Sequence, residues 1–425
     1  MTMGLLLPIY LAAFLLPLAW SQTLPLSSTS RWIIDANGHR VKFRCANWPG
    51  HLEANIPEGL SSQKLDTIVN WVAEQGFNCV RLTYSIDMAL SPNVDVSDSF
   101  LEGAKSAGIN ETEFMNVYNT AVKINPFLAN STRREVFGNI IDALWNRGVM
   151  TVLDNHVSKA TWCCNYTDGN GWWDEASGLY NAGNQRYFNT TNWLAGLKAM
   201  AVWAQEHKGV VAMSLRNEMR QLPVINKVED WYKFVEKAAS LIHLNNADLL
   251  VVVGGVYGGM DLAHMKKKAL NTTGWAGKNV WEFHAYEFSI LFKIFGYNDC
   301  SKVKDLWGLY AGFVLEQGKS WTGPLWLSEF GVAMKGGDYK SGLNENDYKY
   351  LMCLVDYMTN NDADWSVWGL QGSYYNRDGA ILNDESFGVL NFEWSTWRNP
   401  EFPGLLGAMW NVTQGPKKND ILISI

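Results

Sequence analysis

Eight short apolar runs, separated by longer amphipathic stretches, constrain this chain more than any other feature of its sequence. The runs lie at 41–47, 78–83, 150–155, 211–217, 249–254, 280–284, 325–329 and 364–370. Patterns typical of amphipathic helices lie between them, at 62–75, 132–147, 192–207, 229–245 and 344–360. Such alternation favours parallel strands joined by crossover helices. The sequence therefore predicts an α/β fold of the (β/α)8 TIM barrel type.

Most of the runs end, at their carboxyl ends, in polar or aromatic residues. These are Asn47, Trp48, Arg81, His156, Asn217, Glu218, His284, Tyr286, Glu329 and Trp368. A charge at the end of a buried strand is costly unless it is paired or has a function. Because the carboxyl ends of barrel strands meet on the face that holds active sites, we expect these side chains to converge. We interpret residues 86–131, after the second run, as a loop insertion on the same face.

Length and composition fit a single barrel domain with loop insertions. The chain has 425 residues, of which 47% are hydrophobic, so it can bury a large core. It has no internal repeat and no proline-rich or serine-rich linker after Ser30. We predict one catalytic domain over 22–425 and a monomer; two ordinary domains would also fit this length.

The amino-terminal residues 1–21 are predicted to be a signal peptide. The apolar segment from Leu5 to Trp20 is followed by Ser21, and Ala19 and Ser21 are small residues at the spacing that a signal peptidase reads. No Lys or Arg precedes the apolar segment, so a retained membrane anchor is the alternative. Both interpretations place the rest of the chain outside the cytosol, and we expect a secreted protein. Acceptors for N-glycosylation agree with this, at Asn110, Asn130, Asn165, Asn189, Asn271 and Asn411.

The cysteines favour disulfides over metal binding. There are six, Cys45, Cys79, Cys163, Cys164, Cys300 and Cys353. In an oxidising compartment we expect at least some of them to pair, and six allow 15 connectivities. Adjacent cysteines rarely bond to each other, but Cys163 and Cys164, beside Trp162, are expected to shape the loop after the third strand. No Cys-x-x-Cys or His-Glu-x-x-His motif occurs, so we predict no metal and no cofactor.

Charge argues against nucleic acid as a partner. The net charge is -7 and only 18% of the residues are charged, with no basic stripe of the kind that follows a phosphate backbone.

Two glutamates stand where a pair of carboxyl groups could act together. Glycoside hydrolysis needs one carboxylic acid to protonate the leaving oxygen and one carboxylate to attack the sugar or activate water. Glu218 and Glu329 both end apolar runs. The dipeptide Asn-Glu starts at Asn110, Asn217 and Asn344, but only the middle one ends such a run. Taken alone, either glutamate could instead be part of a structural ion pair.

The order of strand-end residues resembles glycoside hydrolase family 5, the cellulase family of a large retaining clan built on α/β barrels. In that family an Arg ends the second strand, a His follows the third, Asn-Glu ends the fourth, a His and a Tyr follow the sixth, a Glu ends the seventh and a Trp ends the eighth. The matching residues here are Arg81, His156, Asn217, Glu218, His284, Tyr286, Glu329 and Trp368. Phrases such as Met-Ser-Leu-Arg-Asn-Glu also resemble a cellulase-like branch found in plants and fungi.

The resemblance, together with the chemistry, implies a role for each residue. Glu329 is expected to be the nucleophile and Glu218 the acid/base, with a pKa raised by burial and a neighbouring anion. Arg81 should keep Glu329 ionised, and Tyr286 could donate to the same carboxylate. Asn217 is expected to bind the sugar 2-hydroxyl. The remaining three are His156 and His284 as hydrogen-bonding orienters and Trp368 as the floor under the reacting sugar.

The implied partner is a poly- or oligosaccharide, and the implied activity is that of an endo-β-glucanase. The alternatives are a β-glucosidase, a glycosyl-lipid hydrolase or a transglycosylase on the same barrel, and a non-catalytic carbohydrate-binding pseudoenzyme. No membrane contact is expected unless the N-terminal segment is retained. Further aromatic residues are candidate walls of sugar subsites: Trp48, Trp162, Trp172, Trp173, Tyr374 and Tyr375.

Overall fold

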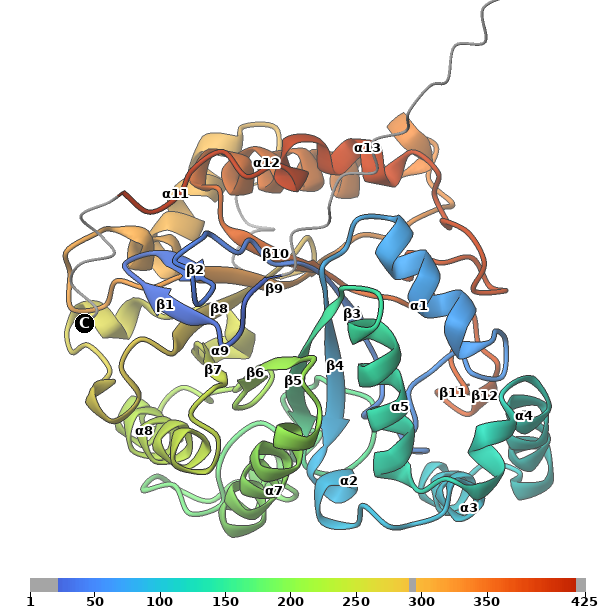
Figure 1. Cartoon of the computed structure of the whole chain (residues 1–425). Helices are drawn as coiled ribbons and strands as arrows, with labels where there is room; N and C mark the ends of the chain where they lie inside the picture. Colours follow the sequence, from blue (N-terminus) through green and yellow to red (C-terminus); the bar gives the residue numbers. More distant parts are fainter. Residues whose placement is uncertain (1–21, 290–295, 418–425) are drawn as a thin grey trace, which may run out of the picture.

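In the computed structural model, which describes residues 22–289 and 296–417, eight parallel strands close into a barrel (Figure 1). Around the barrel these are β10 (Asp364–Val367), β3 (Arg44–Trp48), β4 (Cys79–Ser85), β5 (Met150–Val157), β6 (Val210–Ser214), β7 (Leu250–Gly254), β8 (Asn279–Tyr286) and β9 (Leu325–Gly331). Each pair of neighbours is parallel. The predicted (β/α)8 barrel is confirmed, and each of the eight barrel strands overlaps one predicted run.

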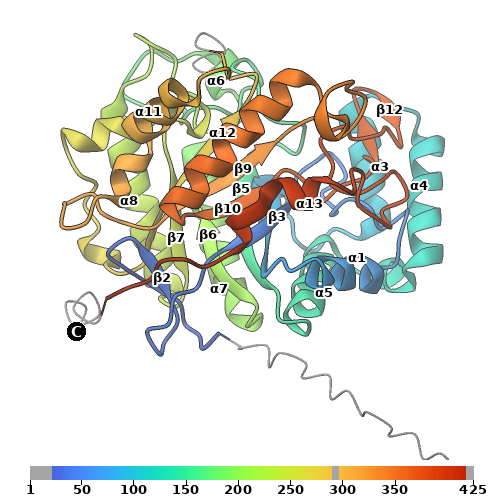
Figure 2. The same cartoon turned by 90° about the horizontal axis from the view of Figure 1, so that it is seen from above.

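Helices surround the barrel (Figure 2). The longer ones are α1 (Leu65–Glu74), α5 (Arg133–Trp145), α7 (Thr190–Trp203), α8 (Val228–Asn245), α11 (Cys300–Tyr310) and α12 (Glu345–Asn361), and the short ones are α6 (Ala182–Gln185), α9 (Val256–Gly259) and α13 (Phe402–Leu406). The five predicted helical stretches are confirmed, with shifted ends. The Thr132 side chain and Glu135 form a capping box at the start of α5, where the sequence has Thr and Glu three positions apart.

The insertion after β4 is helical, so its interpretation as a loop is wrong. It contains α2 (Ile86–Leu90), α3 (Val96–Ala107) and α4 (Glu111–Ile124). The apolar face of α3, including Val96, Phe100 and Ala104, is buried because these residues recur every four positions. Phe100 packs against Tyr375, which follows β10, with ring centroids 5.2 Å apart. The insertion therefore supports loops at the carboxyl ends of the strands, as expected.

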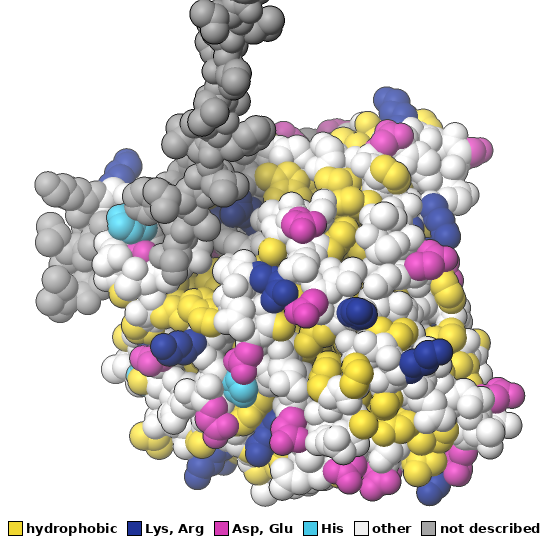
Figure 3. Space-filling view, turned by 45° about the vertical axis from the view of Figure 1, so that its right-hand side comes forward, with side chains coloured by type: hydrophobic (Ala, Val, Ile, Leu, Met, Phe, Trp, Pro, Cys, Tyr) yellow, Lys and Arg dark blue, Asp and Glu magenta, His cyan; other side chains and the backbone are white. Residues whose placement is uncertain are grey.

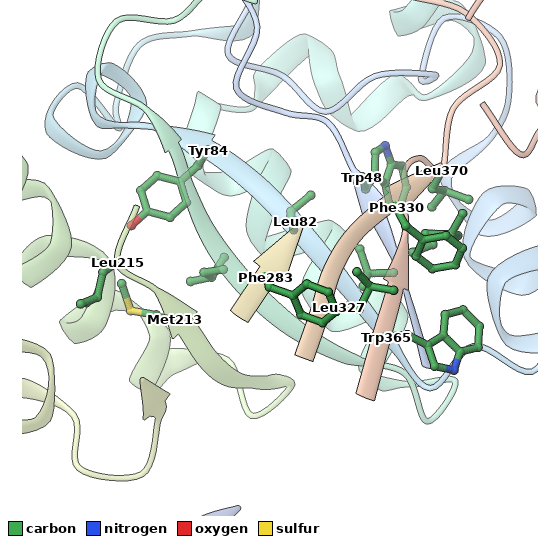
Figure 4. Packing of buried hydrophobic residues seen from close by; sticks show 14 of the residues in the cluster. Trp48, Leu82, Tyr84, Met213, Leu215, Phe283, Leu327, Phe330, Trp365 and Leu370 are labelled. Carbon is green, nitrogen blue, oxygen red and sulfur yellow. The ribbon is translucent and has the colours of Figure 1, made fainter. Parts of the chain in front are cut away.

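The inside of the barrel is apolar at one end and polar at the other. Near the amino ends of the strands, Phe43, Val152 and Trp326 pack with Ile33 of the hairpin β1 (Ser27–Thr29) and β2 (Trp32–Ile34). Figure 4 shows part of the larger apolar cluster, formed where strands meet the surrounding helices. Side chains two residues apart lie on the same face of a strand, so the side chain of Asp154, like that of Val152, points into the barrel. Polar side chains therefore collect at the carboxyl end of the barrel.

All six cysteines are paired. Cys45–Cys79 joins β3 to β4, Cys300–Cys353 joins α11 to α12, and Cys163 bonds to the adjacent Cys164. The last pair is of a rare kind, since adjacent cysteines rarely bond to each other.

The surface shows the charged side chains and the predicted glycosylation acceptors. Figure 3 shows acidic and basic side chains interspersed on the face that it draws. The asparagines of all six glycosylation acceptors are exposed. Among residues 22–289 and 296–417, no helix is both long and apolar enough to cross a bilayer. The predicted signal peptide, 1–21, lies outside the described residues.

Candidate active site

The eight predicted site residues come together at the carboxyl ends of the strands. A cleft of about 530 Å³ is lined by His156, Glu218, Tyr286, Glu329 and Trp368. The other three, Arg81, Asn217 and His284, are buried and contact these residues.

Arg81, in the middle of β4, is the centre of the hydrogen-bond network. Its Nη1 donates to Glu329 Oε1 at 2.7 Å and to Asn47 Oδ1 at 3.0 Å. Its Nη2 donates to Asp154 Oδ1 at 2.8 Å and to Asn217 Oδ1 at 2.9 Å. Burial alone would lower the pKa of Arg81, but the surrounding carboxylates outweigh it and raise this pKa. The guanidinium is therefore a fixed cation that orients four side chains.

Glu329, on β9, has donors at both carboxylate oxygens. Arg81 occupies Oε1, and the Tyr286 hydroxyl donates to Oε2 at 3.1 Å. His284 Nδ1 lies 3.6 Å from the same Oε2. Burial raises the pKa of Glu329 to about 7, against the opposing effects of His284 and Arg81. Hydrogen bonds from donors in fixed positions stabilise the ionised form of a carboxyl group. With two such donors, Glu329 keeps its negative charge more readily than a carboxyl group with fewer donors.

Glu218 follows β6, and His284 lies between its carboxylate and that of Glu329. His284 Nδ1 lies 2.9 Å from Glu218 Oε1. The backbone of Glu218 is left-handed, with φ 43°, an uncommon conformation for a residue with a side chain. Arg220 Nη1 donates to the Glu218 carbonyl at 2.9 Å, which helps to hold this conformation. Burial raises the pKa of Glu218 to about 7, and Asp168 and Asp154 add to the rise while Arg220 and Arg81 oppose it.

His156 connects the network to the floor of the cleft. Its Nδ1 lies 2.6 Å from Asp154 Oδ2, and its Nε2 lies 3.3 Å from Asn217 Nδ2. Burial and nearby Arg81 lower the pKa of His156 well below its ordinary value, so the ring is neutral. Because Asp154 can only accept, Nδ1 carries the proton and Nε2 accepts from Asn217. The ring stacks on Trp368, with centroids 5.4 Å apart.

The candidate subsite walls are divided between cleft and core. Trp162 and Tyr374 line the cleft. The interpretation as walls is wrong for the other four, Trp48, Trp172, Trp173 and Tyr375, which are buried in the hydrophobic core. Residues that pack between strands and helices cannot reach a ligand.

Four polar residues of the network were not predicted. Asn47 was expected at this end of the barrel, but not as a partner of Arg81. His51, Asp154 and Glu282 were not predicted at all. Asp154 precedes His156 by two positions, and Glu282 precedes His284 by two positions, so the period of a strand places each pair on one face. That period is the signal that could have found Asp154 and Glu282.

Two groups of three side chains bring possible metal-binding atoms within 4.8 Å of one another in the described part of the chain. In His156, Cys163 and Cys164, the sulfurs form a disulfide and are not thiolates. In Glu218, His284 and Glu329, the Arg81 guanidinium lies 2.7 Å from Glu329 and opposes a second cation. Neither group has the chemistry of a metal site.

Comparison with known proteins decides the family. The profile described as Cellulase (glycosyl hydrolase family 5) matches residues 34–373. The chain belongs to glycosyl hydrolase family 5. A glycosyl hydrolase 5 family protein from Chamaecyparis obtusa is 36% identical over 413 residues, which cover 95% of this chain and 69% of that protein. An endoglucanase from Paenibacillus polymyxa is 21% identical over 393 residues, or 87% of this chain and 83% of the relative.

Solved structures of similar proteins share the barrel of this family 5 chain. The catalytic domain of the major endoglucanase from Xanthomonas campestris has a TM-score of 0.67 at 20% identity, covering 91% of this chain and 99% of that one. An endocellulase variant from Pyrococcus horikoshii, in complex with cellotetraose, has a TM-score of 0.67 at 17% identity, covering 92% and 100%. At these identities the likeness concerns the fold.

Proposed function

We propose that this family 5 protein is a retaining β-glycosidase that hydrolyses β-linked glucan. The spacing of two carboxylates is the main support: one oxygen of Glu218 and one of Glu329 lie within 4.8 Å of each other. Retaining enzymes place their carboxyl groups roughly 5–5.5 Å apart, whereas inverting enzymes leave about 6.5–9.5 Å for a water molecule. The narrow gap favours direct attack by one carboxylate.

Glu329 is the nucleophile and Glu218 the acid/base in this proposal. The donors Arg81 and Tyr286 keep Glu329 anionic, so the proton shared by the pair resides on Glu218. Glu218 gives this proton to the leaving oxygen as the sugar C1–O bond breaks, and a Glu329 oxygen bonds to C1. Glu218, now a carboxylate, then takes a proton from water, whose oxygen displaces Glu329 from C1.

The other predicted residues position the reacting sugar. Trp368 forms the floor under the ring. Asn217, fixed by Arg81 and His156, is placed to bind the sugar 2-hydroxyl as charge develops. His284 orients Glu218.

Glucan as the substrate rests on the relatives, several of which are named endoglucanases or endocellulases. An extracellular location is supported by three disulfides and by exposed glycosylation acceptors. The point of attack along the glucan depends on which ends of the cleft are open to a continuing sugar chain.

Proton NMR of the first product tests the mechanism. A β-linked glucan oligosaccharide should yield the β-anomer first, with the α-anomer appearing only as mutarotation proceeds. A Glu329→Gln sample is the control for contaminating activity. An initial α-anomer would contradict retention.

A further inference from the structure

A contact between two distant loops stands at one end of the cleft. Trp162 lies in the loop after β5, whereas Tyr374 and Arg377 follow β10. The guanidinium carbon of Arg377 lies 3.4 Å from the centre of the Trp162 ring, and Tyr374 packs edge-on against that ring with centroids 5.5 Å apart. All three residues line the cleft. We call Trp162, Tyr374 and Arg377 the bridge.

The bridge spans the carboxyl ends of two strands. β3 and β4 lie between β10 and β5 in the barrel, so loops that meet from β5 and β10 cross over them. Hydrogen bonds to the loops that follow β3 and β4 hold the β5 loop in place where it crosses them. The Thr161 hydroxyl donates to Glu53 Oε1, after β3, at 3.2 Å, and the Ala160 N–H donates to Asp87 Oδ2, after β4, at 2.9 Å. Four loops therefore meet in one wall.

The positions of the carboxylates show which path this wall obstructs. Glu218 follows β6 and Glu329 lies on β9, three strands away around the barrel. A sugar chain that passes between them crosses this line, from the ends of β3 and β4 toward the ends of β7 and β8. The bridge stands at the first of these exits. Trp368, at the end of β10, lies on the same side, with its ring centroid 6.4 Å from that of Trp162.

We propose that the bridge makes the cleft a pocket for the non-reducing end of a β-glucan or β-glucoside, so that single sugars are released from chain ends. This rests on the proposed function, in which the reacting sugar lies on Trp368 with C1 toward Glu329. The opposite end of that sugar faces the bridge, where a preceding sugar would collide with Trp162. The enzyme then acts as a β-glucosidase, one of the alternatives considered from sequence, and not as the expected endo-β-glucanase.

Arg377 offers a partner that only a terminal sugar needs. Its Nη1 is buried and has no hydrogen-bond partner within residues 22–289 and 296–417. A terminal sugar carries a free hydroxyl where an internal sugar carries a glycosidic oxygen. A hydroxyl accepts a charge-assisted hydrogen bond well, so the bridge can bind a chain end as well as exclude a continuing chain.

Product analysis on the whole protein tests the pocket. Cellopentaose and laminaripentaose, labelled at the reducing end, are the probes, with an activated aryl β-glucoside beside them. We expect glucose as the first unlabelled product, while the labelled chain shortens by one sugar at a time. Early labelled products two or more sugars shorter, with the aryl glucoside still hydrolysed, would overturn the pocket and leave the proposed function intact. If no probe is hydrolysed, the proposed function fails and the pocket with it.

Opening the bridge provides the second arm. Trp162→Ala combined with Arg377→Ala should raise the share of internal cleavage at least about tenfold, the usual scale of steric discrimination in a pocket. Arg186→Ala is the matched control, because this exposed arginine lies over Tyr187 at 4.5 Å, outside the cleft lining. Hydrolysis of the aryl glucoside shows that each variant is folded. An unchanged product pattern in a folded double variant would overturn the proposal, and Arg377→Ala alone serves if the double variant does not fold.

Discussion

At the scale of single residues, Arg81 controls how the carboxylates are held. It donates to four side chains while fully buried, with Glu282 also 3.8 Å away. Removing one partner from a buried network of charges leaves the others unpaired, which costs more than the pairing itself contributes. The planar guanidinium of Arg81 donates hydrogen bonds in two directions at once. The single ammonium group of a lysine could not replace all of these donors.

Arg81→Lys should therefore lower the free energy of unfolding by about 3–5 kcal/mol. It should also lower kcat, because Glu329 loses a fixed donor. Urea unfolding and steady-state kinetics measure the two effects. Arg147→Lys is the control, since its pair with Asp66 is exposed and should change stability by less than about 1 kcal/mol. Equal effects of the two substitutions would contradict the central role of Arg81.

The two glutamates should fail in different ways when replaced. Glu329→Gln removes the attacking group and should abolish turnover of every substrate. Glu218→Ala should still accept an aryl glycoside with an acidic phenol and then stall before hydrolysis. Azide, which needs no general base, should restart this variant and yield a β-glycosyl azide. A β-glycosyl azide from Glu329→Gln together with an α-glycosyl azide from Glu218→Ala would reverse the roles, and losses below about tenfold in both variants would place the catalytic pair elsewhere.

At the scale of elements, patterns within one segment could be predicted from the sequence, whereas contacts between distant segments could not. The capping box of Thr132 and Glu135 is local, so the start of α5 could be predicted. The prediction that Trp172 lines the cleft was wrong because the sequence does not distinguish a tryptophan of a loop after a strand that faces the cleft from one that packs into the core. Asp154 was missed because its partner Arg81 lies 73 positions away in sequence. The bridge likewise depends on loops that only the closed barrel brings together.

Thr132→Ala tests the contribution of that cap. The side chain accepts from the Glu135 N–H, and the Glu135 carboxylate accepts from the Thr132 N–H at 2.7 Å. Losing the cap should lower the free energy of unfolding by about 1 kcal/mol. Thr120→Ala, at an exposed position of α4, removes a hydroxyl that bonds the Asn116 carbonyl and should change stability little. A Thr132 effect no larger than the control would show that the helix start is held by packing alone.

At the scale of the whole molecule, buried carboxyl groups link stability to pH. Burial raises the pKa of Glu218, Glu329 and Glu385 from the ordinary 4.5 to about 7. Glu218 and Glu329 share one proton, so the folded state holds one proton on this pair and one on Glu385 that the unfolded chain has released. This stabilisation is complete below about pH 4.5 and is lost as pH rises through about 7. Glu135 acts in the opposite direction, because its hydrogen bonds to Thr132 lower its pKa and its contribution is lost as pH falls.

Glu385→Gln tests one of these contributions by urea unfolding at pH 5 and pH 8. Histidines such as His156 and His264 oppose the carboxyl groups, because burial lowers their pKa and the folded state is favoured as pH rises, so the comparison of wild type with variant isolates Glu385. The amide keeps the shape and the oxygen that accepts from the Phe387 N–H at 2.7 Å but cannot ionise. Between pH 5 and pH 8 the free energy of unfolding should fall further, or rise less, in the wild type than in the variant. An equal change in both proteins would mean that Glu385 is ionised in the folded protein at both pH values.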